Sequence, residues 1–333
     1  MVNDTVPEAV EGAVRRWTMV TRLAALFSAS VLLFACQAAS SLVKPRLEEE
    51  GQVFVYLQPL SQEADRLTFR LGGMSAMRGD GTTVPLSLHI DEIRGKELRR
   101  ERLLASADLP PGQYLGFSFR AAGATLKGEE GDVAIPPAEE QPMMSFPFAV
   151  ARKKALVVTL AFRYRESLQG GIRFAPSFAA EVPGKLVTGL VGLVTSRRAN
   201  TVTAFDKVTG KVVAVVPTGT SPAGMVLNPI SRRAYVAISG EDAVETVDFL
   251  GMDVIGRGQL VVGDRPEELA LTPDRKTLLT ANTGSNTVSV VDAASPISMT
   301  LTSVPAPSAV GCIETSPVIL APSLPAILPD HVA

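Results

Sequence analysis

The segment Asn200–Asp206 reads NTVTAFD, and it decides the fold because two later segments repeat its pattern. The second copy, Asp242–Asp248, reads DAVETVD, and the third, Asn286–Asp292, reads NTVSVVD. In each copy apolar and polar residues alternate and many side chains are β-branched, which is typical of half-buried strands. The copies recur about every 42 to 44 residues, which is the length of a unit of four short strands.

A turn signal recurs between these copies. Gly219–Pro222 reads GTSP and Gly263–Pro266 reads GDRP, and each is followed by a second turn, at Asn228-Pro229 and at Thr272-Pro273. Glycine permits a tight turn, whereas proline fixes φ and cannot continue a central strand. These signals divide each unit into four strands, so we predict an all-β domain of repeated antiparallel sheets over residues 186–295.

These units resemble the YVTN family of β-propeller repeats, which is named for a tetrapeptide in each blade. Tyr235–Ala237 is the nearest match to that tetrapeptide, and Leu279–Asn282 is a drifted copy. The family pattern asn-thr-val-x-val-x-asp is matched by Asn200–Asp206 and Asn286–Asp292, whereas Asp242–Asp248 departs from it at the first two positions. The resemblance implies a β-propeller built from small four-stranded blades.

Three aspartates end the repeated segments: Asp206, Asp248 and Asp292. Carboxylates could ligate a metal, but the same residue at the same place in every unit is better explained as a cap for the turn that follows. The repeat supplies two units and the start of a third, whereas propellers have about four to eight blades. We therefore predict a partial propeller of two to three blades, without a metal or cofactor.

The amino-terminal residues have the pattern of an export signal. Arg15, Arg16 and Arg22 precede an apolar run over residues 23–34. This run is too short to span a bilayer and fits the core of a secretion signal. Met19 is an alternative to Met1 as the start, because the stretch before it is long for such a signal.

The apolar run ends in Leu33-Phe34-Ala35-Cys36, which resembles a bacterial lipobox. The resemblance implies that residues 1–36 are a lipoprotein signal peptide and that Cys36 is the lipid attachment site, which anchors the chain to a membrane. The alternative is a buried cysteine at the end of an ordinary helix. Gln37 follows instead of aspartate, which in other lipoproteins favours the outer membrane, on its periplasmic or its surface side. Residues 37–50 are small and then charged, and we predict a flexible tether.

Residues 51–184 alternate in short apolar runs punctuated by glycine and proline, which predicts an antiparallel β-sandwich. Asp80-Gly81 is a strong hairpin turn. The segment Leu109–Tyr114, LPPGQY, resembles the strand start of transthyretin-like and carboxypeptidase-regulatory-like sandwiches. A closer resemblance is to the uncharacterised sandwich domain that bacterial lipoproteins carry after the lipidated cysteine. Both resemblances imply a fold and no chemistry.

The repeat stops after Asp292, and residues 296–333 are rich in proline and poor in charge. Proline cannot donate to a strand ladder, so we predict no regular blade in this segment. Two interpretations stay open. The segment is either a Pro-rich disordered tail or the out-of-frame end of a natural protein that continues with further blades.

The composition argues against several classes of functional site. The chain has two histidines and two cysteines, which argues against a His/Cys metal centre and a His-based catalytic triad. Its net charge of −2 indicates no nucleic-acid-binding surface. Its single tryptophan, Trp17, lies in the signal, whereas a quinone site in a propeller needs tryptophans around the cofactor.

We therefore predict no catalytic, cofactor-binding or metal-ligating residue, and one modified residue, Cys36. The predicted function is that of a membrane-anchored exported lipoprotein, a non-enzymatic binding or scaffold protein of the cell envelope. Its propeller would meet a protein or glycan partner, and nucleic acid is not expected. Two alternatives stay open. Related propellers include lactonases and quinoprotein-like oxidoreductases, so the chain could be an incomplete or inactive propeller enzyme, or it could be a structural spacer in an envelope complex.

Overall fold

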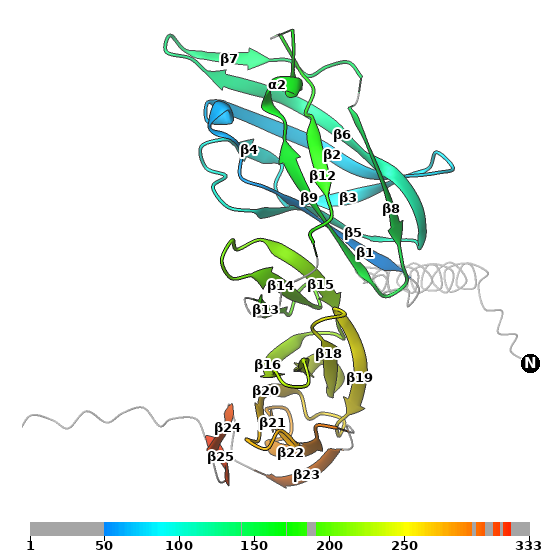
Figure 1. The fold of residues 1–333 in the computed structure, drawn as a ribbon, viewed down its shortest axis with the longest axis vertical. Coiled ribbons are helices and arrows are strands. Elements are labelled where there is room, and N and C mark those ends of the chain that lie inside the picture. Colours follow the sequence, from blue (N-terminus) through cyan, green and yellow to red (C-terminus); the bar gives the residue numbers. More distant parts are fainter. Residues whose placement is uncertain are drawn as a thin grey trace, which may run out of the picture. The chain divides into compact units, whose positions relative to one another are not determined.

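The computed structural model describes residues 50–140, 142–170, 172–184, 191–294, 298–303, 309–313 and 316–320. Nearly all regular structure in these residues is β, which confirms the predicted all-β fold class (Figure 1). The helical elements among them are α2 (Tyr164–Ser167) and the 3₁₀ turns η1 (Gln62–Ala64) and η2 (Ser239–Glu241). No helix in this part of the chain is both long and apolar enough to cross a bilayer. The predicted signal peptide, Cys36 and the tether up to residue 49 lie outside the described residues.

The strands between residues 51 and 184 form one curled sheet of ten strands and a separate two-stranded hairpin. The strands of the curled sheet are β1 (Gly51–Leu57), β2 (Leu67–Arg78), β3 (Thr83–Leu88), β4 (Glu92–Arg94), β5 (Arg102–Leu109), β6 (Gly112–Lys127), β7 (Asp132–Ile135), β8 (Met143–Val150), β9 (Ala155–Phe162) and β12 (Phe178–Glu181). The hairpin consists of β10 (Leu168–Gln169) and β11 (Arg173–Phe174). The strand order is β12-β9-β1-β5-β3-β2-β6-β7, with β4 beside β2 and β8 beside β6. These neighbours are antiparallel except β1 and β9, which are parallel.

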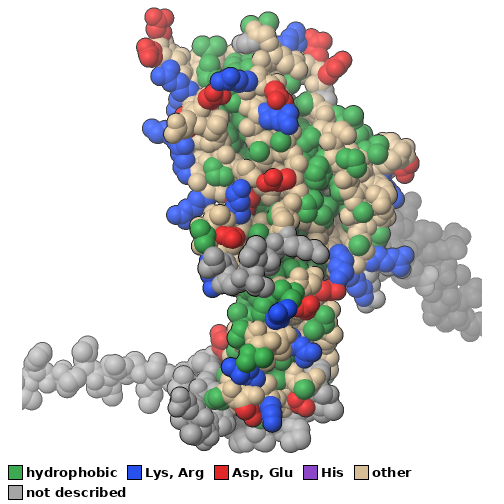
Figure 2. Space-filling view, in the orientation of Figure 1, with side chains coloured by type: hydrophobic (Ala, Val, Ile, Leu, Met, Phe, Trp, Pro, Cys, Tyr) green, Lys and Arg blue, Asp and Glu red, His purple; other side chains and the backbone are tan. Residues whose placement is uncertain are grey.

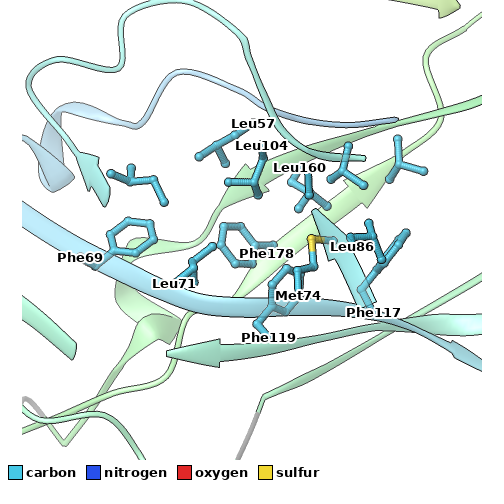
Figure 3. Close-up of a cluster of buried hydrophobic side chains, with 14 of the residues drawn as sticks. Leu57, Phe69, Leu71, Met74, Leu86, Leu104, Phe117, Phe119, Leu160 and Phe178 are labelled. Atoms are coloured by element: carbon cyan, nitrogen blue, oxygen red, sulfur yellow. The ribbon is translucent and has the colours of Figure 1, made fainter. Parts of the chain in front are cut away.

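The core of this sheet lies inside its curl. Val53, Val55 and Leu57 of β1 are fully buried, as their alternation predicts. Figure 3 shows Phe119 and Phe178 beside each other in this core. Their ring centroids are 4.7 Å apart, although they come from strands that are distant in the strand order. Burying one large apolar side chain contributes about 1.5–3 kcal/mol. The shared core therefore holds the two ends of the sheet near each other.

The LPPGQY motif has a structural role in this sheet. Tyr114 is buried, and its hydroxyl donates to the Pro110 carbonyl oxygen at 2.8 Å. Its ring stacks on Phe148, with ring centroids 5.0 Å apart. Tyr114 therefore connects the turn before β6 to the neighbouring strand β8.

The predicted β-sandwich would have two separate packed layers, whereas these strands form one curled sheet. β3 pairs with β2 along one part and with β5 at Ser87 and Leu88, so it joins the layers into one continuous sheet. Register shifts between β2 and β6 let these long strands bend. The predicted hairpin at Asp80-Gly81 does join β2 to β3. Gly81 has a φ of 83°, and Asp80 Oδ1 accepts the Thr82 N–H at 2.9 Å.

The repeated segments form three small antiparallel sheets, here called blades 1, 2 and 3, in which consecutive strands pair in order. Blade 1 has the strands β13 (Val191–Ser196), β14 (Thr201–Asp206) and β15 (Val212–Pro217). Blade 2 has β16 (Pro222–Asn228), β17 (Arg233–Ile238), β18 (Ala243–Asp248) and β19 (Asp253–Gln259). Blade 3 has β20 (Pro266–Leu271), β21 (Thr277–Asn282), β22 (Thr287–Asp292) and β23 (Ser298–Ser303). This meander is the strand arrangement of propeller blades.

The blades share one hairpin register. β13 pairs with β14, β17 with β18 and β21 with β22, each over the whole length of both strands. The residue pairs beside the connecting loops occupy the same repeat positions: Ser196 with Thr201, Ile238 with Ala243, and Asn282 with Thr287. Identical registers confirm that the segments are copies of one unit.

An asparagine or aspartate in the left-handed region ends each of these loops. Asn200, Asp242 and Asn286 have φ values of 54°, 50° and 55°, a region that Asn and Asp tolerate better than most residues. The Asn200 side-chain oxygen accepts the Ser221 N–H at 2.9 Å, and Asp242 Oδ1 accepts the Arg265 N–H at 2.7 Å. Ser221 and Arg265 directly precede the first strands of blades 2 and 3. This contact, here called the blade tie, therefore connects each blade to the next.

Blade 1 also contacts the curled sheet. Val215 of β15 packs with Phe54 of β1 and Val157 of β9 in a small apolar cluster. Beside it, the Val212 N–H donates to Glu101 Oε2 at 2.7 Å. Burial raises the pKa of Glu101, although this hydrogen bond opposes the increase. The contact therefore combines apolar burial with one partly buried carboxyl group.

The segment after Asp292 differs from its prediction. β23 completes blade 3, and two further strands, β24 (Ala309–Ile313) and β25 (Ser316–Leu320), pair as an antiparallel hairpin. The expectation of no regular blade in residues 296–333 is therefore wrong for β23. The reason is local, because Ser298–Ser303 contains no proline and can pair with β22 along its length. The reading frame is a property of the gene, and the out-of-frame interpretation stays a prediction.

We expect Asp242→Ala to lower the free energy of unfolding by about 1–3 kcal/mol. The substitution removes the acceptor for the N–H groups of Gly263 and Arg265 and leaves alanine in the left-handed region. Asp242→Asn keeps a side-chain oxygen and should lose less than half as much. Urea unfolding followed by circular dichroism measures both, with the exposed Glu130→Ala as control. Equal losses in the alanine and asparagine variants would contradict the blade tie.

Candidate functional site

The two ends of the blades carry different side chains. Successive turns of an antiparallel meander fall at alternate ends of a sheet. One end, here called the turn face, carries the turns 207–211, 229–232, 249–252 and 272–276. The opposite end, here called the loop face, carries the loops 197–200, 218–221, 239–242, 260–265 and 283–286.

A carboxylate lies between blades 1 and 2 on the loop face. Glu245 of β18 is 5% exposed, and its two oxygens accept the Gly219 N–H at 3.2 and 3.1 Å. Arg257 of β19 donates to Glu245 Oε1 at 3.2 Å and pairs with Glu241 Oε2 at 2.6 Å. Burial raises the pKa of Glu245, and the contacts with Gly219 and Arg257 oppose that increase. Glu245 is thus a buried carboxyl group held by both blades.

A second carboxylate lies between blades 2 and 3. Asp264 is 1% exposed, and its oxygens accept the Ser285 hydroxyl at 2.7 Å and the Val261 N–H at 3.2 Å. Behind it, the Asn282 amide donates to the Ser289 hydroxyl oxygen at 2.8 Å. These polar groups are buried, so each hydrogen bond offsets a desolvation cost. The cluster is a satisfied polar network inside the blade contact.

Each of the two blade contacts contains a hydrogen bond between a carboxylate and a hydroxyl group at the same two repeat positions. The position that holds the carboxylate in one contact holds the hydroxyl group in the other. At the first contact, Glu241 Oε1 accepts the Thr220 hydroxyl at 2.6 Å. At the second, Asp264 Oδ1 accepts the Ser285 hydroxyl. Thr220 and Asp264 occupy the same place in the repeat, as do Glu241 and Ser285. Because the pair is kept while its members exchange, these carboxylates serve blade packing.

A third polar group spans all three blades. Arg197, which follows β13, forms an ion pair with Glu267 of β20. Glu267 also accepts the Ser239 hydroxyl at 2.9 Å. Glu267 is thus already engaged by blades 1 and 2, and a ligand would have to displace these contacts to bind it.

The three repeated aspartates cap turns, as predicted. Asp206 accepts the Thr209 N–H at 2.7 Å, which holds the pKa of Asp206 below its usual value. Asp248 accepts the Leu250 N–H at 3.0 Å, and Asp292 accepts the Ala294 N–H at 2.8 Å. Within the described ranges, no three His, Cys, Asp or Glu side chains are grouped so that they could hold a metal ion.

The turn face carries large apolar side chains in solvent. Val208, Ile230 and Leu250 are 72%, 72% and 43% exposed, and they lie in three successive turns of blades 1 and 2. Basic residues lie in the same set of turns: Lys207, Lys211, Arg232, Arg275 and Lys276. Over the molecule as a whole, Figure 2 shows basic and acidic side chains interspersed. Exposed apolar residues that share one face indicate an interaction surface.

The curled sheet contains a cavity of about 560 Å³ near β8 and β12. Met144 and Phe146 of β8 line it together with Phe178 of β12. Arg163 and Glu166 also line it and form an ion pair at 2.9 Å. This cavity could not be predicted from the sequence, because its residues come from segments that meet only in the folded sheet. The adjacent pair Met143-Met144 is the local signal that could have drawn attention to it.

Comparison with known proteins found no matching family model and no matching curated protein sequence. Among solved structures, the chain is similar to hydrazine synthase from Kuenenia stuttgartiensis, with 26% identity over 37% of this chain and a TM-score of 0.34. It therefore spans 35% of that chain. It is also similar to virginiamycin B lyase from Staphylococcus aureus, with 10% identity over 80% of this chain and 89% of that one, and a TM-score of 0.33. A functionally unknown protein from Desulfotomaculum acetoxidans shows 10% identity over 70% and 72% of the two chains, with a TM-score of 0.30.

We expect Glu245→Gln to flatten part of the pH dependence of stability. Burial raises the pKa of Glu245 in the folded state, so folding favours its protonated form. The stability that protonated Glu245 contributes is therefore fully present below the ordinary carboxyl pKa. It is lost as the pH rises through the raised pKa of the folded state. Glutamine cannot ionise, so the variant should lose less stability than wild type as the pH rises from below the ordinary carboxyl pKa to neutrality. Urea unfolding across this range measures the difference.

The matched control for this prediction is Glu268→Gln, which changes an exposed carboxyl group on β20. Its stability should follow the wild-type pH curve. Parallel curves for wild type and Glu245→Gln would show that the buried carboxyl group does not titrate with folding.

Proposed function

We propose that the protein is a non-enzymatic binding or scaffold lipoprotein of the bacterial cell envelope, built on YVTN-type propeller blades. The YVTN assignment is supported by the Asn/Asp-to-Asp pattern of the repeated segments and by the common hairpin register. The binding role is supported by the carboxylates of the loop face, because Glu245 and Asp264 accept hydrogen bonds within the blade contacts and serve blade packing. The turn face then offers the side chains that are free for a partner.

The single observation that carries the binding role is the set of apolar side chains at the turn face. Val208, Ile230 and Leu250 stand in solvent at the tips of successive turns, where they stabilise neither the blade cores nor the blade contacts. Burying such side chains against a partner contributes about 1.5–3 kcal/mol each at most. Interfaces also favour arginine beside apolar residues, and Arg232 lies in the same turn as Ile230. A protein partner fits this chemistry better than a glycan.

The membrane anchor is the second component of the proposal. It rests on the sequence Leu33-Phe34-Ala35-Cys36 and on the basic and apolar residues before it. A lipid-linked Cys36 followed by a short tether would hold the folded part close to the outer membrane. A partner in the envelope would then meet the turn face at a high local concentration.

Metabolic labelling with a radioactive fatty acid tests the anchor in bacteria that produce the full chain. Wild type should incorporate the label, and Cys36→Ser should not, because serine offers no thiol for the lipid. Cys312→Ser is the matched control, since it removes the other cysteine and should keep the label. Label in the Cys36→Ser protein would disprove lipid attachment at this residue.

Site-specific photocrosslinking in the same cells tests the turn face. A photoreactive residue at Ile230 should give a covalent adduct with an envelope protein. The same residue at Val262, which is 88% exposed on the loop face, should not give that adduct. A combined Val208→Asp and Leu250→Asp variant should reduce the Ile230 adduct about tenfold, because it places charge in the contact. Equal adducts at Ile230 and Val262 would exclude a turn-face partner, and a stoichiometric metal or absorbing cofactor in the purified chain would favour an enzyme.

A further inference from the structure

Blade 1 has one strand fewer than the other two blades in the described part of the chain. In blades 2 and 3, the strand that opens the common hairpin is paired on both sides, β17 by β16 and β18, and β21 by β20 and β22. The corresponding strand of blade 1, β13, pairs with β14, and no other described strand pairs with it. The outer edge of β13 therefore presents main-chain donors and acceptors at the place where the other blades have a further strand.

The repeat provides an internal comparison for the exposure of the side chains beside this edge. Val194 of β13 is 50% exposed. The residues at the same repeat position in blades 2 and 3, Val236 and Thr280, are both 0% exposed. Val236 is covered because it packs with Val202 and Val216 of blade 1, whereas no described blade packs on the corresponding face of blade 1, so Val194 is half in solvent beside the β13 edge. A neighbour at this edge would bury apolar surface as well as pair the main chain.

The chemistry of β13 is that of an unprotected sheet edge. Its sequence, VGLVTS, contains no charged residue and no proline. Four other edge strands carry the residues that natural proteins use to prevent edge pairing, whereas β23 and β24 lack them as β13 does. These residues are Asp132 in β7, Pro147 in β8, Glu181 in β12, and Asp253 and Arg257 in β19. β13 is therefore an edge without this protection.

We propose that the edge of β13 is a self-association site, which pairs antiparallel with β13 of a second copy of this chain. A two-fold dimer places one surface against itself, so any charged edge would meet its own charge across the axis. The uncharged VGLVTS edge avoids that repulsion. In blade 2 the strand that corresponds to β13 is β17, and β16 pairs antiparallel with its outer edge, from Met225 opposite Val236 to Asn228 opposite Arg233. A second copy of β13 would pair with β13 in the same antiparallel way. The two copies would join their blades 1 into one continuous sheet.

The proposal is tested on the detergent-solubilised full chain by sedimentation over low to high micromolar concentrations. Wild type should show a monomer–dimer equilibrium. Val194→Lys should weaken self-association by roughly tenfold or more, because each dimer would place two ammonium groups near its axis. Val194→Thr keeps an uncharged β-branched side chain and should still dimerise. Val262→Lys adds the same charge to an exposed loop and is the matched control, with unchanged association.

Hydrogen exchange on the same samples identifies the strand. The amides of residues 191–196 should become protected as the dimer forms and should exchange faster in the dilute monomer. Protection of these amides that does not depend on concentration would mean that the same chain covers the edge, and it would overturn the proposal. A wild-type monomer at every concentration, or a dimer that Val194→Lys leaves intact, would overturn it as well.

Discussion

The arrangement of the blades depends on a single kind of contact, the blade tie. The side-chain oxygen of a loop residue with positive φ accepts the backbone N–H of the residue directly before the next blade. A four-stranded sheet of this size has two apolar faces and cannot bury both alone, so it must stack on its neighbours. The ties at Asn200 and Asp242 set where that stacking begins. The φ values near 50° explain why the repeat keeps asparagine or aspartate at this position, because β-branched residues would be strained there.

Once the blades are tied, the faces between them are filled in two different ways. Between blades 1 and 2 the contact is largely apolar, with Val202, Val236 and Ile238 packed around the edge where Glu245 is held. Between blades 2 and 3 apolar packing continues, but Asp264 and Asn282 add a buried hydrogen-bonded network. A buried network is stable only when all its groups are paired, so it favours one alignment of the two sheets. The charged residues of the loop face thus maintain the blade order.

The function proposed here follows from how these groups are distributed. The buried carboxylates Glu245 and Asp264 are engaged at the blade contacts, whereas Val208, Ile230 and Leu250 stand in solvent at successive turns of the turn face. Blade 1 is the exception in the stack, because Val194 lies in solvent at a position that the other blades cover. A propeller-like stack with exposed apolar turns and an uncharged strand edge is suited to assembly with other proteins. The curled sheet contacts this stack through β15 and leaves the edge of β13 uncovered by any described strand.

Local features of the chain were determined by the sequence itself. The period of the repeat, the hairpin at Asp80-Gly81 and the turn caps at Asp206 and Asp248 all depend on residues close together in the chain, and their patterns sufficed to predict them. Prolines misled the prediction for the last strand of blade 3, because composition was averaged over a segment whose first part contains a proline-free strand. Only the tertiary structure decided the parallel pairing of β1 with β9, the joining of two layers through β3, the cavity near β8 and the uncovered edge of β13. These features pair strands that are distant in the chain, and alternation specifies which side of a strand is buried but not which strand lies beside it.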